Sequence, residues 1–461
     1  MIQHSNGPRA RQQRQVAQQA QKVEANHFFN LLTSPQLLEH VEAHLPEHRE
    51  RKFPPTLTLA MFLGQVLSAD GSCQNAVDEA LVTRLLCGVA TGSASTSAYC
   101  QARARLPEGM VSALVRQSAQ LLTQCVAQPW LWRGRHVKLV DGSTVVMADT
   151  PENQRCFPQI KQQAAGVGFP LARMVGVISL AHGAVLDVAM GPYYGKGTAE
   201  DSLFRKLIDV FVAGDVMLAD AYFSSYFLIA KLQQRGVDVL LEQHGGRKTD
   251  FRRGEALGVR DHLVSWPKPR RPEWMSAEEY RCYPDEILMR EVRVDKKVLV
   301  TTFLDPRQHA KAELGELFWQ RWNVELDLRN LKTTLGMEWL SCKTPSMVSK
   351  QLWVYVLAYN LIRLLMAQAA STANTSPREL SFKHTLQVWL AWSARQAFLP
   401  EAEDMSELFK LIAQKRVANR PGRIEPRMIK RRPKNYTLLG ASRLKVRRCI
   451  KRYGRPKKRR A

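Results

Sequence analysis

Three acidic residues stand where their carboxylates could bind metal ions together. Asp141 follows the apolar run 136–140 and Asp220 follows the apolar run 216–219, so each is expected at the end of a strand, whereas Glu325 lies in a helix-like stretch. Acids at the ends of neighbouring strands, beside a helix acid, can hold two divalent cations about 3.5–4 Å apart. Such ions activate an oxygen nucleophile on one side of a phosphorus and stabilise the leaving oxygen on the other. The pattern predicts phosphodiester chemistry with Mg²⁺ or Mn²⁺, which suit all-oxygen ligands.

Each acid taken alone also has a purely structural interpretation. Asp141 could belong to an Asp-Gly turn, Asp220 could cap the next helix, and Glu325 could be one of many acids on a helix surface. The neighbours of Glu325 favour chemistry, because Arg321 precedes it by four residues and Lys332 follows it by seven. At about 100° per residue these three side chains share one helix face, where they could bind a metal and DNA phosphates. The structural alternative is a surface salt bridge worth about 0.3–0.5 kcal/mol.

The residues around Glu325 resemble a signature of the DDE transposases of bacterial insertion sequences. In one subgroup of that family the signature reads Tyr-x2-Arg-x3-Glu-x6-Lys. Arg321, Glu325 and Lys332 match its last three positions, while Phe318 stands in place of the Tyr. The Phe removes a hydroxyl group but leaves the metal-binding position intact.

Two further segments resemble the family's Asp motifs. Residues 140–144 (Val-Asp-Gly-Ser-Thr) are similar to the first motif, and residues 214–224, which contain Asp220, are similar to the second. Asp220 lies 79 residues after Asp141, and the helix acid follows 105 residues later. The long second gap resembles the β-rich insertion of this subgroup. The resemblance covers about 130–365.

The resemblance implies a ribonuclease-H-like transposase that binds the terminal inverted repeats of an insertion sequence. It would catalyse metal-dependent DNA cleavage and strand transfer by a cut-and-paste route. Asp141, Asp220 and Glu325 would hold two Mg²⁺ ions, for which Mn²⁺ can substitute, and Arg321 and Lys332 would contact DNA. The expected partners are the double-stranded DNA of the inverted repeats and of the target, with a homodimer formed on the DNA. The expected location is the bacterial cytoplasm, in association with the nucleoid and not with a membrane.

Three Trp residues are candidates for contact with unpaired bases. In this subgroup the flanking end is often released through a DNA hairpin, and a Trp of the insertion helps to hold a flipped base. Trp266 lies in the insertion here and is the candidate for that role. Trp319 and Trp322 could stack on a base or fill the core, and for Trp322 the core is favoured.

The elements that must position these residues form an α/β fold. Short apolar runs predict strands at 136–140, 174–180, 184–190, 216–219 and 237–241, with helices at 199–211 and 224–235. This order predicts an α/β sheet of mixed direction, and the family resemblance implies that the sheet is ribonuclease-H-like. A long helix is expected at 314–335, ended by Gly336.

The pattern along the chain divides it into five parts. The parts are a polar N-terminal tail (1–26), a helical DNA-binding domain (27–130), the ribonuclease-H-like catalytic core (131–345, with the β-rich insertion at about 243–303), C-terminal helices (346–405) and a basic tail (406–461).

Positive charge is concentrated at the C-terminal end. The 461-residue chain has a net charge of +25, and the segment from Lys415 to Arg460 alone carries 20 Lys or Arg and a single acid, Glu425. A nearly neutral body with a basic tail predicts specific chemistry in the body and sequence-independent phosphate binding by the tail. With 45% hydrophobic and 24% charged residues, the composition is that of a globular protein rather than a disordered or fibrous one.

The longest apolar stretch predicts a buried helix rather than a membrane span, and the cysteines predict free thiols. Residues 352–366 are apolar, but they contain Asn360 and Arg363 and are too short to span a bilayer comfortably, so a buried helix is expected. The eight cysteines show no CxxC spacing, which indicates reduced thiols rather than a zinc site or a disulfide framework.

Two other functions remain open on this sequence. One is a ribonuclease-H-like nuclease that cuts DNA without joining it. The other is a DNA-binding protein with a catalytically dead core, which the intact set of three acids argues against.

Overall fold

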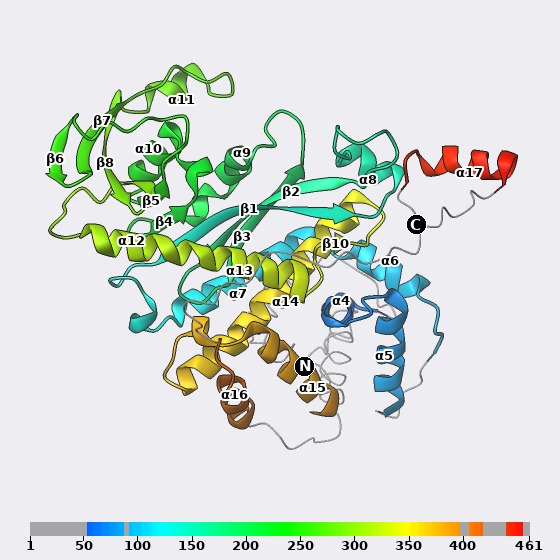
Figure 1. The fold of residues 1–461 in the computed structure, drawn as a ribbon. Helices are drawn as coiled ribbons and strands as arrows, with labels where there is room; N and C mark the ends of the chain where they lie inside the picture. Colours follow the sequence, from blue (N-terminus) through cyan, green and yellow to red (C-terminus); the bar gives the residue numbers. More distant parts are fainter. Residues whose placement is uncertain (1–52, 87–91, 397–404, 418–438, 455–461) are drawn as a thin grey trace, which may run out of the picture.

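The computed structural model describes residues 53–86, 92–396, 405–417 and 439–454. A ten-stranded mixed sheet lies at its centre, with helices on both faces (Figure 1). The strands of its first half are β1 (Val137–Met147), β2 (Leu171–Ser179), β3 (Val185–Pro192), β4 (Val216–Ala219) and β5 (Asp238–Glu242). Their order is β3-β2-β1-β4-β5; β2 is antiparallel to both neighbours, and β4 is parallel to β1 and β5. This is the ribonuclease H arrangement, so the predicted fold class is confirmed.

The segment predicted as an insertion extends the same sheet. Its strands are β6 (Glu255–Gly258), β7 (Asp261–Pro267), β8 (Glu286–Val294) and β9 (Lys297–Thr301), with the short helix α11 (Ala277–Arg281) between β7 and β8. These strands are antiparallel to one another, and β9 pairs with β5. The insertion is therefore β-rich and continuous with the core.

Helices before and after β4 cover one face of the sheet. They are α9 (Glu200–Phe204), the 3₁₀ helix Arg205–Val210 and α10 (Tyr226–Gln234). Phe204 and Ile229 pack there with Val140 of β1, while the preceding Leu139 belongs to the core on the other face. Because the strands are buried on both faces, their sequences are continuous apolar runs rather than alternating ones.

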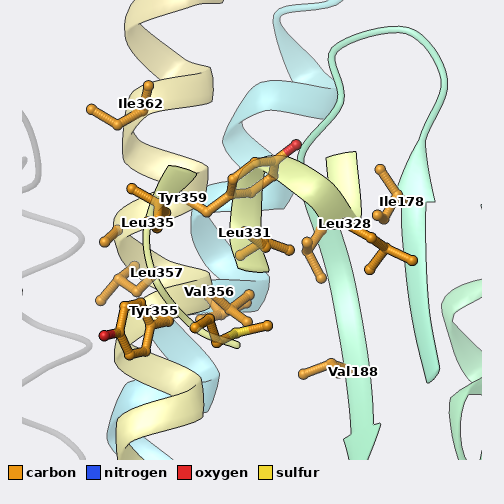
Figure 2. Packing of buried hydrophobic residues seen from close by; sticks show 14 of the residues in the cluster. Ile178, Val188, Leu328, Leu331, Leu335, Tyr355, Val356, Leu357, Tyr359 and Ile362 are labelled. Atoms are coloured by element: carbon orange, nitrogen blue, oxygen red, sulfur yellow. The ribbon is translucent and has the colours of Figure 1, made fainter. Parts of the chain in front are cut away.

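The long helix α14 (Pro345–Thr372) dominates the other face. It packs there with α7 (Glu108–Gln124), α12 (Lys311–Trp319) and α13 (Asn323–Arg329). Figure 2 shows part of this core, in which Leu328 and Leu331 pack with Tyr359 of α14 and Ile178 of β2. Within the described residues α14 is the one helix long and apolar enough to cross a membrane, but 89% of its apolar window is buried inside the protein. The expected buried helix is confirmed.

A buried ion cluster joins α13 to α14. Asp327 is fully buried, and its Oδ1 accepts hydrogen bonds from Arg363 Nη2 and, at 3.0 Å, from the Tyr359 hydroxyl. Arg378 Nη1 donates to both Asp327 oxygens, at 2.8 Å to Oδ1 and at 2.7 Å to Oδ2. This cluster explains why Arg363 stands in an apolar stretch. It also fixes the orientation of α13, which carries Glu325.

The remaining helices surround this body. They are α4 (Pro55–Leu67), α5 (Cys73–Leu86), α6 (Ser97–Arg105), α8 (Pro151–Cys156), α15 (Phe382–Gln396), α16 (Ser406–Ala413) and α17 (Arg443–Tyr453), with the two-residue strand β10 (Trp339–Leu340) beside β1. Phe62 of α4 belongs to the same core as α7 and α14, and Lys350 Nζ donates to the Ala104 carbonyl at 2.6 Å. The domain boundary near residue 130 stays a prediction. The N-terminal tail 1–26 and much of the basic tail lie outside the described residues.

Candidate active site

Asp141 lies where one edge of β1 becomes open. The parallel pairing of β1 with β4 ends at Val140 and Ala219, and β10 pairs with β1 only from Val146. The expectation that the strand stops at Asp141 is wrong, because β2 pairs with β1 on the other side along 138–146. Asp141 therefore occupies a rigid mid-strand position beside a gap in the pairing.

Asp220 follows β4 directly and lies next to Asp141. It caps the 3₁₀ turn Ala221–Phe223, and its Oδ1 accepts a hydrogen bond from the Tyr222 N–H at 2.9 Å. Because Val140 and Ala219 are in register, the two acids occupy the next positions on adjacent parallel strands. The cap explains the local conformation of Asp220 and is compatible with metal binding.

Burial raises the pKa of Asp141 to about 7. The Gly142 N–H lowers this pKa by donating a hydrogen bond to Asp141 Oδ1 at 2.9 Å, the nearby Asp220 raises it, and the Arg321 guanidinium lowers it. The pKa of a carboxyl rises when it is removed from water and placed near another carboxylate. A bound cation would stabilise the ionised carboxylates and so lower the pKa of Asp141. This environment therefore favours a positively charged ligand.

The helical segment from α12 to α13 supplies the third acid and two cations. It is interrupted by a 3₁₀ turn at Gln320–Trp322 and ends in a π-helical turn at Asn330–Thr334, before Gly336 at φ +84°. This segment covers most of the helix predicted at 314–335. Such irregular turns are frequent at functional sites.

The two cations of the signature, Arg321 and Lys332, lie near β1. Arg321 Nη2 is 3.5 Å from Glu325 Oε1, and its charge acts on Asp141. Lys332 Nζ donates a hydrogen bond to Ser143 Oγ of β1 at 3.2 Å. Asp141, Asp220, Arg321 and Lys332 thus lie at one edge of the sheet. Glu325 is partly exposed, and its carboxylate contacts Arg321.

The donor set fits a hard divalent cation. Asp141, Asp220 and Glu325 would hold it, and all three offer carboxylate oxygens, the ligands that Mg²⁺ and Mn²⁺ prefer. Within the described residues, no three His, Cys, Asp or Glu side chains lie close enough together to form a ready-made metal cage. The fit therefore rests on the chemistry of the donors and on the electrostatics around Asp141.

Comparison with known proteins identifies the family. Residues 132–361 match the family model described as "Transposase DDE domain". Transposase InsG for insertion sequence element IS4, from Escherichia coli (strain K12), is 27% identical over 356 residues, which cover 74% of this chain and 77% of the relative. The chain belongs to the DDE transposases of bacterial insertion sequences. Among solved structures it is similar to piggyBac transposase in a synaptic complex with hairpin DNA, with a TM-score of 0.43 and 8% identity over 87% of each chain.

Trp266 of this transposase is not available to a DNA base. Its side chain is 1% exposed, its indole N–H donates to Glu291 Oε1 at 2.8 Å, and the Arg247 guanidinium lies 3.6 Å from its ring centroid. Because both the rim and a face of the ring are occupied, the expectation of a base-stacking role for Trp266 is contradicted. Trp319 and Trp322 are 51% and 48% exposed, so the core position favoured for Trp322 is also wrong.

Two neighbours of the candidate site are not predicted from the sequence. Ser143 was read only as part of a motif, yet it accepts the hydrogen bond from Lys332. Glu200, at the start of α9, has a carboxylate that lies against Gly142 and acts on Asp141. Gly142 was the one available signal for Glu200, because a Gly inside a strand often marks close approach of another group.

Proposed function

We propose that Asp141, Asp220 and Glu325 bind divalent metal ions and that the transposase uses them to cut and join DNA. The observation that carries this proposal is that Asp141 and Asp220 are neighbours on adjacent strands, directly after the pairing of β1 with β4 ends. The helix that carries Glu325 packs beside them. Mg²⁺ is the proposed ion, two per site, with Mn²⁺ as a substitute. When bound, the ions supply an activated oxygen nucleophile and stabilise the leaving oxygen.

The side chains of the site would prepare and hold the DNA. Asp141 must lose its proton before it can bind a cation, and the nearby Arg321 guanidinium favours that loss. Arg321 and Lys332 lie on the helix face that meets β1, where they can bind phosphate oxygens on either side of the cut. Water attacks the phosphorus, the P–O3′ bond breaks, and a 3′-hydroxyl is left. That hydroxyl then attacks a phosphodiester of the opposite strand or of the target, so no covalent bond to the protein is needed.

The proposed partners are the terminal inverted repeats and the target DNA. The described part of the basic tail supports this, because α17 is exposed and carries six Lys or Arg among the eleven residues Arg443–Tyr453. A basic, exposed helix binds phosphates without regard to sequence. A homodimer on DNA, in the bacterial cytoplasm, is the proposed working form, because two element ends must be cut together.

The decisive experiment compares charge-neutral variants of the acids. Asp141→Asn, Asp220→Asn and Glu325→Gln are incubated with a labelled duplex that carries the element end, in Mg²⁺ and, as a control, in Ca²⁺. Each variant is expected to lose cleavage by about 10³-fold or more, while its binding of the duplex without metal stays within about twofold of the parent. Matched controls are Asp209→Asn, whose side chain is 87% exposed, and Glu316→Gln on the exposed side of α12.

The products separate transposition from its alternatives. A nick at the element boundary followed by hairpin or joined products supports the proposal. Nicks that are never followed by joining would indicate a nuclease without strand transfer. Binding without any cut in Mg²⁺ or Mn²⁺ would indicate a dead core, and full cleavage by one of the variants would remove that residue from the site.

A further inference from the structure

A basic loop leaves the sheet beside the candidate active site. It consists of residues 243–254, which connect β5 to β6, and four cations and a single acid give it a net charge of +3: Arg247, Lys248, Arg252, Arg253 and Asp250. We propose that this basic loop binds the phosphate backbone of the DNA next to the cut. The inference rests on the proposed function, and it adds a DNA-binding surface in the insertion to the residues of the family signature.

Strand pairing places the start of the basic loop next to Asp220. β1, β4 and β5 are parallel, so the residues that follow their paired parts lie at the same end of the sheet. Ala219 of β4 is in register with Leu241 of β5. The next residue of β5 is therefore level with Asp220 on the neighbouring strand, about 4.8 Å away, and the loop starts one residue further on. Ligands of such sheets bind outside the carboxyl ends of the strands, so DNA held at Asp220 passes close to the loop.

Buried side chains of the insertion hold the basic loop in place. The Arg247 guanidinium lies 3.6 Å from the ring centroid of the buried Trp266, and His262 Nδ1–H donates to the Arg253 carbonyl at 2.6 Å. Gly254, at φ +74°, lies so close to β7 that a Cβ atom built on it would be 1.9 Å from a carbonyl oxygen of that strand. Because these contacts fix the loop, little conformational entropy is lost when it binds a ligand. Trp266 thus supports the basic loop instead of contacting a base.

The outward side of the basic loop presents positive charge to solvent. The side chains of Arg252 and Arg253 are 90% and 82% exposed, and Lys248 is exposed as well. Asp250 lies 2.9 Å from the first guanidinium and 3.6 Å from the second, but one carboxylate cannot neutralise both. Ion pairs between exposed side chains contribute little to stability. These cations can therefore exchange that contact for charge-assisted hydrogen bonds to phosphate oxygens.

The charge of the basic loop is a local feature of the body of the protein. The 414 residues before Lys415 carry only +6 of the net charge of +25, yet the twelve residues of the loop carry +3. A solvated loop without a ligand needs no such excess of one sign, and like charges held close together repel one another. A polyanion removes this repulsion, and DNA is the polyanion that the neighbouring active site must approach.

The first test measures binding of the full chain to a labelled duplex that carries the element end. Fluorescence anisotropy is recorded in EDTA over a series of salt concentrations, so the readout does not depend on catalysis. The triple variant Lys248→Ala/Arg252→Ala/Arg253→Ala is expected to lower the slope of log K against log salt by about 2–3, because each phosphate contact contributes about 0.9. Its affinity at about 0.1 M salt is expected to fall about 10²-fold. Its melting temperature is expected to equal that of the parent, since the substituted side chains are exposed.

A matched control removes the same charge from other exposed positions. Lys206→Ala/Arg307→Ala/Lys383→Ala removes three exposed cations that lie outside the basic loop. Arg307 follows β9, which runs antiparallel to β5, so it lies toward the opposite end of the sheet. This variant is expected to bind the duplex within about twofold of the parent, with an unchanged slope. Equal losses in the two triple variants would show an effect of overall charge and would overturn the inference.

A second test locates the contact on the DNA. Lys248 is replaced by the photo-crosslinking residue p-benzoylphenylalanine, and the crosslinked nucleotide is mapped on a denaturing gel. The crosslink is expected within one helical turn of the cut, about 10 base pairs. A crosslink confined to more distant DNA, or none at all, would contradict a contact next to the cut.

The outcomes keep this inference separate from the proposed function. If the loop variant retains the affinity and the salt slope of the parent while Asp141→Asn abolishes cleavage, the basic loop does not bind DNA and the proposed active site stands. A lower melting temperature of the loop variant with an unchanged slope would assign the loop a structural role and overturn the inference. If Asp141→Asn cleaves as the parent does, the proposed active site fails, whereas the anisotropy measurement still decides whether the loop binds DNA.

Discussion

Replacing Asp141 with Asn should make the metal-free transposase more stable while it abolishes cleavage. The Asp141 carboxyl is half-buried near Asp220 and Glu200, and its pKa is raised from 3.8 to about 7, chiefly by removal from water. Since a raised pKa means that the folded protein disfavours the charged form, ionised Asp141 reduces the free energy of unfolding. Asn has nearly the same shape and carries no charge, so the variant avoids this cost.

The size and the pH range of the effect follow from the pKa shift. A rise of about 3 pKa units corresponds to ~4 kcal/mol, of which we expect about half, ~2 kcal/mol, because the shift is shared with the neighbouring acids. Between about pH 4 and pH 7 the folded protein holds a proton that the unfolded chain has lost, so stability falls as pH rises through this window. Above about pH 7 the loss is complete and constant. The variant lacks the titrating group and therefore lacks this loss.

Urea unfolding in EDTA, at a series of pH values from about 5 to about 8, measures the difference between variant and parent. The variant's advantage should grow up to about pH 7 and then level off. Adding Mg²⁺ should stabilise the parent but not the variant, because only the parent binds the ion tightly in the folded state. The exposed Asp209→Asn serves as the control and should show neither effect. The reasoning would be refuted if Asp141→Asn were less stable than the parent in EDTA at about pH 8. It would also be refuted if the difference in free energy of unfolding between variant and parent were the same at every pH.

Three further outcomes are expected. Lys332→Ala should lower cleavage about 10²-fold with little change in duplex binding, measured on the same labelled duplex, whereas an unchanged rate would exclude a role at the cut. Asp327→Asn should lower the free energy of unfolding by about 3–5 kcal/mol, since it leaves Arg363 and Arg378 without their buried partner; a loss below about 1 kcal/mol in denaturant unfolding would contradict this. Truncation before Lys415 should weaken non-specific DNA binding and flatten the dependence of log K on log salt, because it removes phosphate-binding cations, and an unchanged slope would show that the tail does not contact DNA.

Much of the core could be predicted from local patterns. The apolar runs of β2, β3, β4 and β5 are short and bounded by turn residues, so their positions and the mixed sheet followed from the sequence. The helical segment up to Gly336 was predicted for the same reason, since its period and its end signal are local. The face shared by Arg321, Glu325 and Lys332 needed only helix geometry.

Features that depend on distant partners could not be predicted. The Asp-Gly pair looked like a turn, but β2 supplies hydrogen bonds that carry β1 through Asp141 to Met147. Trp266 was assigned to DNA because it lies in the insertion, yet Glu291 and Arg247, which are distant in sequence, enclose its ring. Trp322 was assigned to the core from its residue type, although the 3₁₀ turn leaves it exposed.

Glu200 shows most clearly why the neighbours of a candidate site cannot all be predicted from a sequence signature. Its helix has five residues, and nothing in the local sequence separates it from the neighbouring Asp201, which is an ordinary helix acid. The difference arises 58 residues earlier, where Gly142 leaves the space that the Glu200 carboxylate occupies. A Gly in the middle of a strand weakens that strand, so its presence next to Asp141 needs a compensating reason. At this position the reason is the Glu200 carboxylate, which occupies the space that a Cβ atom of residue 142 would need, so Gly142 is explained by this close approach and not by a turn.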